Sequence, residues 1–267
     1  MKKITAIILC LVLIISFAAC SNHNENTTIA VTTTQAEGIT TAVQDQKWEW
    51  QKDTPENQGH NSNALPAIHS TFDTFPLLAS VIIKDGYIVD EYYKDGYDEA
   101  SSFILNSASK SITSALIGIA IDKGYIESVD VPISEYFPQV LNFNNESWQQ
   151  ITIRHLLTHT SGISTTDDAL WDEWRNSDNW VDYILNLPIV SLPGTTFSYS
   201  TGNTHLLSAI LQKATGMTAY EFGKEYLFDP IGMDSIKIEA DPQGISDGGN
   251  GIWMTPLRYG KIRAAVS

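Results

Sequence analysis

The stretch Asn106-Ser107-Ala108-Ser109-Lys110-Ser111-Ile112-Thr113 begins a strongly apolar segment and decides which fold the chain is expected to adopt. Apolar residues follow it at helical spacing and predict a helix that ends at Gly124. Ser107 and Lys110 are three positions apart, so their side chains share one face of that helix. Free N–H groups and the helix dipole favour negative charge at this end. The stretch therefore predicts a serine nucleophile with a basic side chain beside it.

The serine needs such a neighbour because a free hydroxyl is a weak nucleophile. Taken alone, however, Ser-x-x-Lys is a weak signal, since about one copy is expected by chance in a chain of this length. In the alternative interpretation, Ser107 caps the helix and Lys110 is a solvated surface lysine. The rest of the sequence has to decide between the two.

Two further segments favour the catalytic interpretation. One is Thr152-Ile153-Arg154-His155-Leu156-Leu157-Thr158-His159-Thr160-Ser161-Gly162-Ile163, and the other is Phe197-Ser198-Tyr199-Ser200-Thr201-Gly202-Asn203. With these segments in this order after Ser107 and Lys110, residues 48–256 resemble the serine β-lactamase and penicillin-binding-protein superfamily, in its class C-like branch.

The resemblance implies an α+β fold, in which an antiparallel sheet is flanked by helices and joined to a mostly helical subdomain. It also implies a serine hydrolase that cleaves an amide or ester bond of a small molecule or peptide through an acyl-enzyme on Ser107. Lys110 and Tyr199 would share the proton transfer and would titrate as one unit. No cofactor is implied.

One position departs from the family pattern. Many relatives carry Asn two residues after the motif tyrosine, where this chain has Thr201. Tyr-Ser-Thr-Gly resembles instead the esterase and 6-aminohexanoate-dimer-hydrolase-like members, and Thr201 is expected at the substrate site. Two alternatives remain beside the hydrolase: a catalytically inactive cell-surface binding protein, and a DD-peptidase or class C-like β-lactamase.

Aromatic residues near these motifs allow more than one interpretation. Trp171 and Trp174 are spaced i, i+3 in an acidic stretch, and form either the wall of a substrate pocket or half-buried core. His159 is a candidate catalytic histidine, but we favour a structural role, because this segment shapes the scaffold in the resembling family.

Composition argues against two kinds of binding partner, nucleic acid and a thiolate-bound metal ion. The chain has 267 residues, of which 43% are hydrophobic, so it can bury a sizeable core. Its net charge of −15 argues against binding to nucleic acid, because no basic stripe is present to neutralise phosphate. The histidines show no paired metal-ligand spacing, and neither cysteine lies beyond position 20, so no thiolate metal site is expected.

The N-terminal residues predict export and anchoring. Lys2 and Lys3 precede a short apolar run that ends in Phe17-Ala18-Ala19-Cys20, which is typical of a bacterial lipoprotein signal. Cys20 would carry the lipid and hold the protein on the outer face of the cell membrane; the alternative is ordinary cleavage near Ala19. We therefore divide the chain into a signal peptide (1–20), a flexible Thr/Asn-rich linker (21–47) and a hydrolase domain (48–267).

Local signals place a few elements. Asp85-Gly86 between two β-rich runs, 80–84 and 87–93, predicts a hairpin. Thr152 is expected to cap a short helix, and a second apolar helix after Tyr199 should end at Gly216.

The C-terminal residues differ from the expected pattern. The family continues past this point into further strands, a third motif and a closing helix, and tends to read Tyr-Asp-Met-Ala-Lys-Phe-Gly-Leu-Leu where this chain has Leu257-Arg258-Tyr259-Gly260-Lys261. One back-translation of residues 257–267, shifted by one base, restores that family-like sequence. We therefore hypothesise a frameshift after Pro256. With only the hairpin in the main sheet, and with Val81, Ile83 and Ile88 uncovered, the chain as written is expected to fold poorly and to have little activity.

Overall fold

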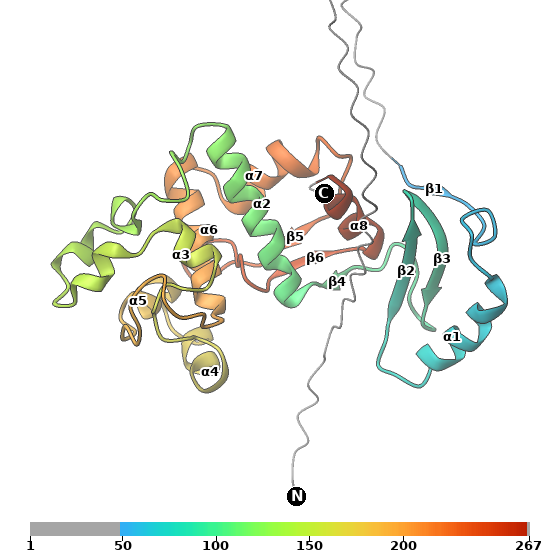
Figure 1. Ribbon diagram of the computed structural model, residues 1–267, viewed down its shortest axis with the longest axis horizontal. Helices are drawn as coiled ribbons and strands as arrows, with labels where there is room; N and C mark the ends of the chain where they lie inside the picture. The colour runs from blue at the N-terminus through green and yellow to red at the C-terminus, as the bar shows by residue number, and fades with distance from the viewer. Residues whose placement is uncertain (1–48, 266–267) are drawn as a thin grey trace, which may run out of the picture. The chain divides into compact units, whose positions relative to one another are not determined.

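Two short sheets and a set of helices make up residues 49–265, the part of the chain that the computed structural model describes (Figure 1). The predicted signal peptide and linker, and with them Cys20, lie outside the described residues. The mixture of helices and sheets agrees with the predicted α+β class.

The strands form two three-stranded sheets, with the orders β1-β3-β2 and β4-β6-β5. Their bounds are β1 Gln51–Lys52, β2 Ala79–Lys84, β3 Tyr87–Tyr93, β4 Phe103–Ile104, β5 Lys237–Ile238 and β6 Ile252–Met254. The predicted hairpin is β2–β3, and it turns at Asp85 and Gly86, whose φ angles are 48° and 85°. Two positive φ values are what a type I′ turn requires, which explains the Asp-Gly pair.

The sheets correct the prediction in two respects. First, β1 pairs with β3 in parallel, so the first sheet is not purely antiparallel. Second, the hairpin is not alone, because β1 extends it and Ile88 is only 3% exposed. The other four strands could not be predicted, because two or three residues are too few to show an alternating pattern.

The α-helices are α1 Leu65–Phe72, α2 Ser109–Asp122, α3 Ile153–Leu157, α4 Trp171–Arg175, α5 Trp180–Leu185, α6 Thr201–Thr215, α7 Ala219–Gly223 and α8 Pro256–Ala265. A π-helical turn, Lys224–Phe228, continues α7. Short 3₁₀ turns are Ser62–Ala64, Asn106–Ala108, Ile133–Glu135, Pro138–Asn142, Glu146–Gln150 and Asp168–Leu170.

The helix ends follow the predicted signals. Gly124, at φ 76°, closes α2, and the N–H of Tyr125 reaches back to the carbonyl of Ala120, as in a Schellman motif. Thr152 caps α3 through the N–H of His155. Gly216, at φ 74°, closes α6.

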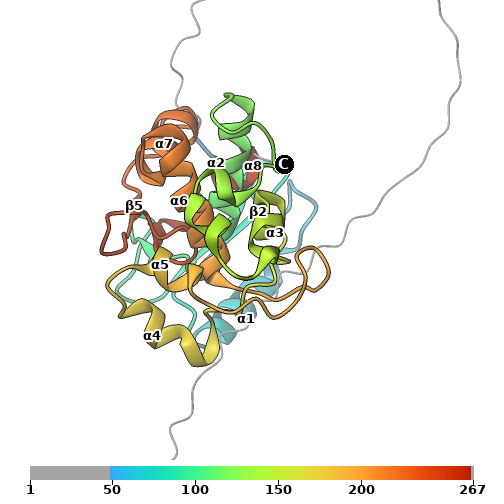
Figure 2. The same ribbon diagram turned by 90° about the vertical axis from the view of Figure 1, so that its left-hand side faces the viewer.

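The core lies around α2 and α6, which pack against each other (Figure 1). α2 contributes Ile112, Leu116 and Ile117, all without exposed surface. α6 is buried on every side from Thr201 to Leu211, and it also contacts α3 and α5, while α4 lies beside α5 (Figure 2).

Several buried polar side chains of α6 form hydrogen bonds with neighbouring segments. Ser161 donates a hydrogen bond to Asn203 Oδ1 (3.0 Å), and the imidazole of His205 pairs with Asp241 (3.0 Å). Ser208 donates to the carbonyl of Ser246 (2.7 Å). These contacts fix the segment from Asp241 to Ser246 on α6, and this segment leads directly into a glycine-rich loop, residues 248–251.

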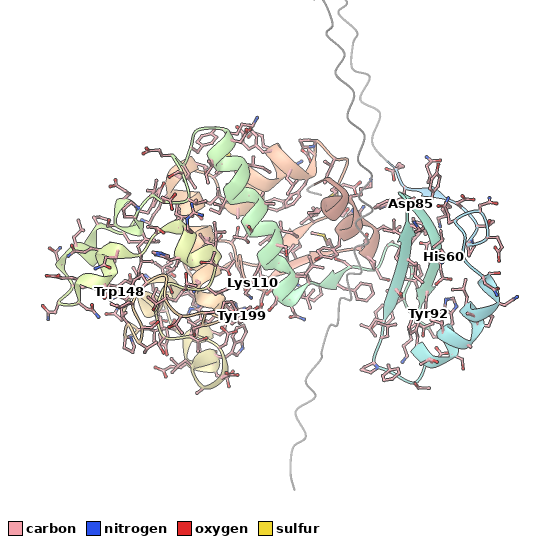
Figure 3. The ribbon with its side chains drawn as sticks, viewed as in Figure 1. His60, Asp85, Tyr92, Lys110, Trp148 and Tyr199 are labelled. Atoms are coloured by element: carbon pink, nitrogen blue, oxygen red, sulfur yellow. The ribbon has the colours of Figure 1, made fainter. Side chains whose placement is uncertain are left out.

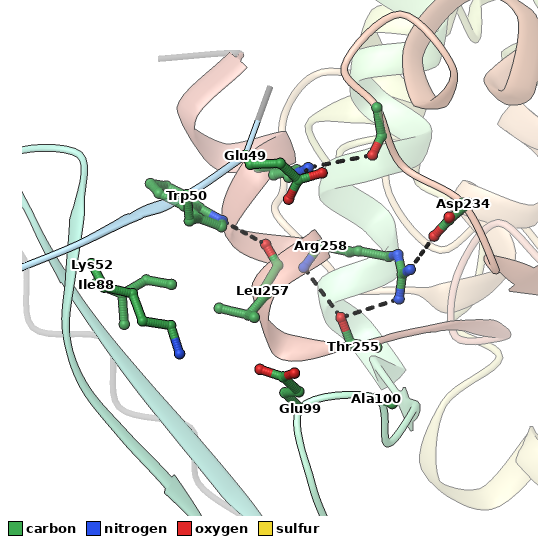
Figure 4. A pocket seen from close by; sticks show the side chains of 12 residues that line it. Glu49, Trp50, Lys52, Ile88, Glu99, Ala100, Asp234, Thr255, Leu257 and Arg258 are labelled. Carbon is green, nitrogen blue, oxygen red and sulfur yellow. Dashed lines mark hydrogen bonds and ion pairs between the residues drawn. The ribbon is translucent and has the colours of Figure 1, made fainter. Parts of the chain in front are cut away.

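α8 packs on β2 of the first sheet. A methyl group at Gly260 would lie 3.0 Å from Ile83 Cδ1, and Trp50 Nε1 donates to the carbonyl of Leu257 (2.9 Å). A cavity of about 410 Å³ remains beside α8, where Arg258 binds Asp234 (Figure 4). α8 thus covers part of a surface that the sequence led us to expect uncovered.

Candidate active site

Ser107 lies in the 3₁₀ turn Asn106–Ala108, which leads directly into α2. The residue before it, Asn106, has a φ of 47°, in the left-handed region where asparagine is enriched among non-glycine residues. Just ahead of this turn, the N–H of Leu105 donates to the carbonyl of Ile252 (2.8 Å), which ties the turn to β6. The predicted serine is therefore held at the start of the apolar helix.

The structure brings the three predicted catalytic side chains together. Tyr199 donates its phenolic O–H to Ser107 Oγ at 2.8 Å, and Lys110 Nζ donates to the same oxygen at 3.2 Å. Lys110 Nζ also lies 4.9 Å from the centre of the Tyr199 ring, and Figure 3 shows the two side chains close together near the start of α2. The Ser107 hydroxyl is thus within hydrogen-bond reach of two groups that can exchange a proton with it.

Two further residues contact this group, and the sequence did not single them out. The carbonyl of Gly249 accepts a hydrogen bond from Lys110 Nζ at 3.0 Å. Asn250 Oδ1 lies 3.5 Å from both Lys110 Nζ and Ser107 Oγ. Both come from the glycine-rich loop before β6. The Gly-Gly-Asn-Gly run was the available signal, but the Gly249 contact is a backbone carbonyl, which no residue type reveals.

His159 supports Tyr199 rather than Ser107. Its ring lies 4.8 Å from the Tyr199 ring, centre to centre, and its Nδ1 accepts the N–H of Ser200 (3.3 Å). Burial, together with the nearby charge of Lys110, lowers the pKa of His159 below its ordinary value of 6.5. A neutral ring packed against the tyrosine agrees with the structural role favoured from the sequence.

Two of the residues predicted to contact substrate, Thr201 and Trp174, are buried. Thr201 is 1% exposed, and both its N–H and its hydroxyl bind the carboxylate of Asp167, so its side chain is turned away from solvent. Trp174 has no exposed surface, which favours the core alternative. Trp171 is partly exposed and packs edge-on against Trp174 at 5.6 Å. The geometry therefore gives no support to a substrate contact by Thr201 or Trp174.

The other features of the described residues lie apart from this group of side chains or indicate no further site. The 410 Å³ cavity beside α8 is lined by none of Ser107, Lys110 and Tyr199. Within residues 49–265, no cluster of three or more histidine, cysteine or acidic side chains could hold a metal ion. Over the same part of the chain, no helix has both the length and the apolar character needed to span a bilayer.

The fold is of the β-lactamase and penicillin-binding-protein type, and comparison with known proteins agrees. The Beta-lactamase family model matches residues 70–259. The chain therefore belongs to this family.

The alignments with individual relatives cover only part of each relative's length. The 6-aminohexanoate-dimer hydrolase of Paenarthrobacter ureafaciens is 24% identical over 69% of this chain and 51% of its own. Penicillin-binding protein 4* of Bacillus subtilis is 32% identical over 60% of this chain and 37% of its own. This chain thus spans about half or less of the length of these curated relatives.

A solved structure confirms the fold. FmtA from Staphylococcus aureus superposes with a TM-score of 0.64 at 17% identity, over 82% of this chain and 67% of that chain. The predicted β-lactamase and DD-peptidase-like fold is therefore correct, apart from the strand details given above.

Proposed function

We propose that this protein is a serine hydrolase that cleaves an amide or ester bond through an acyl-enzyme on Ser107. The observation that carries the proposal is the pair of hydrogen bonds from Lys110 and Tyr199 to Ser107 Oγ. Family membership and the relative named 6-aminohexanoate-dimer hydrolase support the same reaction class.

In the first half of the reaction, Ser107 Oγ gives its proton to the Lys110–Tyr199 pair and attacks the carbonyl carbon of the substrate. The start of α2 favours the negative charge that develops on the carbonyl oxygen. The leaving amine or alcohol departs with a proton from the pair. In the second half, water gives a proton to the pair, attacks the ester on Ser107 and releases the acid, and Ser107 recovers its hydrogen.

Labelling with an active-site probe tests the proposal. A fluorophosphonate should form a covalent adduct on Ser107, and Ser107→Ala should abolish it. Ser109→Ala is the matched control, because Ser109 is a neighbouring serine whose Oγ accepts the N–H of Ile252 instead (3.3 Å). An adduct that persists in Ser107→Ala would assign the nucleophile elsewhere.

The same experiment distinguishes the alternatives. The similarity to penicillin-binding protein 4* makes a DD-peptidase or β-lactamase a second candidate. A fluorescent penicillin adduct without a fluorophosphonate adduct would favour that candidate. The absence of both adducts would favour an inactive cell-surface binding protein.

Lipid anchoring through Cys20 is a separate proposal, and it is supported by the sequence alone. In a bacterial host, Cys20→Ala should move the full chain from the membrane fraction to the soluble fraction. Ala19→Ser, which keeps a small residue and the cysteine, is the control. A Cys20→Ala chain that remains in the membrane fraction would contradict the lipoprotein interpretation.

A further inference from the structure

Asp247 is a buried carboxylate that accepts hydrogen bonds from the glycine-rich loop beside the candidate active site. It has no exposed surface. One oxygen accepts a hydrogen bond from the guanidinium of Arg175, and the other accepts the N–H groups of Gly249 and Asn250, both at 3.1 Å. A buried charge is tolerated when it is paired and hydrogen-bonded in this way. The two backbone N–H groups that bind Asp247 belong to the loop that follows it, so these two bonds also constrain that loop.

One peptide group links Asp247 to Lys110. The N–H of Asn250 and the carbonyl of Gly249 belong to the same peptide unit, and the N–H points to Asp247 while the carbonyl accepts from Lys110 Nζ at 3.0 Å. This peptide is trans, so its two polar groups point in opposite directions. Hydrogen bonds in such a row polarise one another. Asp247 thus sets the direction of the carbonyl that holds the Lys110 amine.

The loop has little freedom to adjust by itself. A methyl group at Gly249 would lie 2.4 Å from Thr201 Cγ2, and one at Gly251 would lie 2.8 Å from Asp247 Cβ. The backbone therefore packs directly against α6 on one side and Asp247 on the other.

Arg175 holds Asp247 from the tryptophan-rich side. It ends α4, and its guanidinium lies 3.9 Å from the Trp180 ring centre and 5.4 Å from that of Trp171. The planar guanidinium suits both the stacking contact and the carboxylate. A row of contacts therefore runs from the tryptophans through Arg175, Asp247 and the Gly249–Asn250 peptide to Lys110.

We propose that Asp247, held by Arg175, is a positioning residue that fixes the Lys110 amine on Ser107 through the Gly249–Asn250 peptide. The inference rests on the proposed function for its catalytic consequence. The contact between Asp247 and the lysine site can also be measured without any reaction.

The first measurement is the kinetics of fluorophosphonate labelling. Asp247→Asn should lower the maximal rate of Ser107 labelling by about 10–100-fold, because small misplacements of a catalytic group have effects of this order. The probe concentration for half-maximal rate should stay the same. Arg175→Lys keeps the positive charge but loses the planar guanidinium. Its maximal labelling rate should lie between those of wild type and Asp247→Asn. The control is Asp130→Asn, which removes an exposed carboxylate that also pairs with an arginine, Arg154.

The second measurement follows Lys110 directly, by NMR of protein labelled with [13Cε]lysine. The Lys110 signal is assigned as the one that Lys110→Arg removes. It should shift in Asp247→Asn and stay in place in Asp130→Asn. If no probe labels the wild-type protein, the proposed function is refuted, whereas a shift of the Lys110 signal in Asp247→Asn would still uphold the positioning role.

An unchanged labelling rate with an unmoved Lys110 signal in Asp247→Asn would overturn the proposal. If Asp247→Asn does not unfold cooperatively and is therefore misfolded, the same two measurements on Arg175→Lys test the proposal. A folded Arg175→Lys protein with the wild-type rate and an unmoved Lys110 signal would overturn it equally.

Discussion

Two regions of the molecule differ in how well they are packed. One is the helical region built on α2 and α6, and the other is the sheet region formed by residues 49–104. Every residue of α6 from Thr201 to Leu211 is buried, whereas among residues 49–104 only Ile88, Val89 and Tyr92 are. Among residues 49–265, the groups that hydrogen-bond with Ser107 Oγ come from the helical region or the loop fixed on it. The candidate chemistry therefore depends on the better-packed region, and we expect the sheet region to unfold locally at a lower free-energy cost.

Substitutions at Lys110 and Tyr199 should change the labelling rate most, and they test whether the two side chains act as one unit. Lys110→Ala and Tyr199→Phe should each slow Ser107 labelling by about 10²–10⁴-fold, because each removes a proton-transfer partner. The double variant should lose little more than either alone, since groups that act as a unit are not additive. Tyr226→Phe, which removes another partly exposed phenol, is the control. Additive losses would show that Lys110 and Tyr199 act separately.

A smaller effect contrasts the two regions directly. Leu206→Ala removes a fully buried side chain from α6 and should lower the free energy of unfolding by about 2–5 kcal/mol. Ile82→Ala, at a β2 position that is 36% exposed, should cost less than about 1 kcal/mol. Urea unfolding followed by near-UV circular dichroism measures both. Equal costs would mean that the sheet region is as tightly packed as the helical one.

The smallest effect concerns pH and His159. Because the pKa of His159 is lowered in the folded protein, the unfolded chain binds more protons below the ordinary value of 6.5. This residue therefore makes the protein less stable as the pH falls from 6.5 toward the lowered value. His159→Asn removes the titration and tolerates the φ of 54° at this position. Its free energy of unfolding should fall less between neutral and mildly acidic pH, and an unchanged slope would contradict the assignment.

Local features could be predicted from the sequence because single residues specify them. Asp85-Gly86 specified the hairpin, Gly124 and Gly216 ended α2 and α6, and Thr152 capped α3. The pairing of β1 with β3 could not be predicted, because strands this short have no alternating pattern.

The site shows the same division. The spacing of Ser107 and Lys110 is a property of one helical turn, and the motif around Tyr199 supplied the third group. Gly249 and Asp247 were missed, because one contributes only a backbone carbonyl and the other acts through a peptide group. Trp174 could not be assigned from spacing alone, since the same interval suits a pocket wall and a core.

The contacts of the candidate site join distant parts of the chain. Tyr199 is 92 positions from Ser107, and Gly249 is 139 positions from Lys110. No short fragment can contain them all, and loops of this length close only when the intervening chain has folded. Reactivity of the Ser107 hydroxyl would therefore report folding of the whole domain. The amount of probe adduct on Ser107 would measure the fraction of native molecules in a mixture. The rate at which the adduct appears during refolding would measure how fast the native site forms.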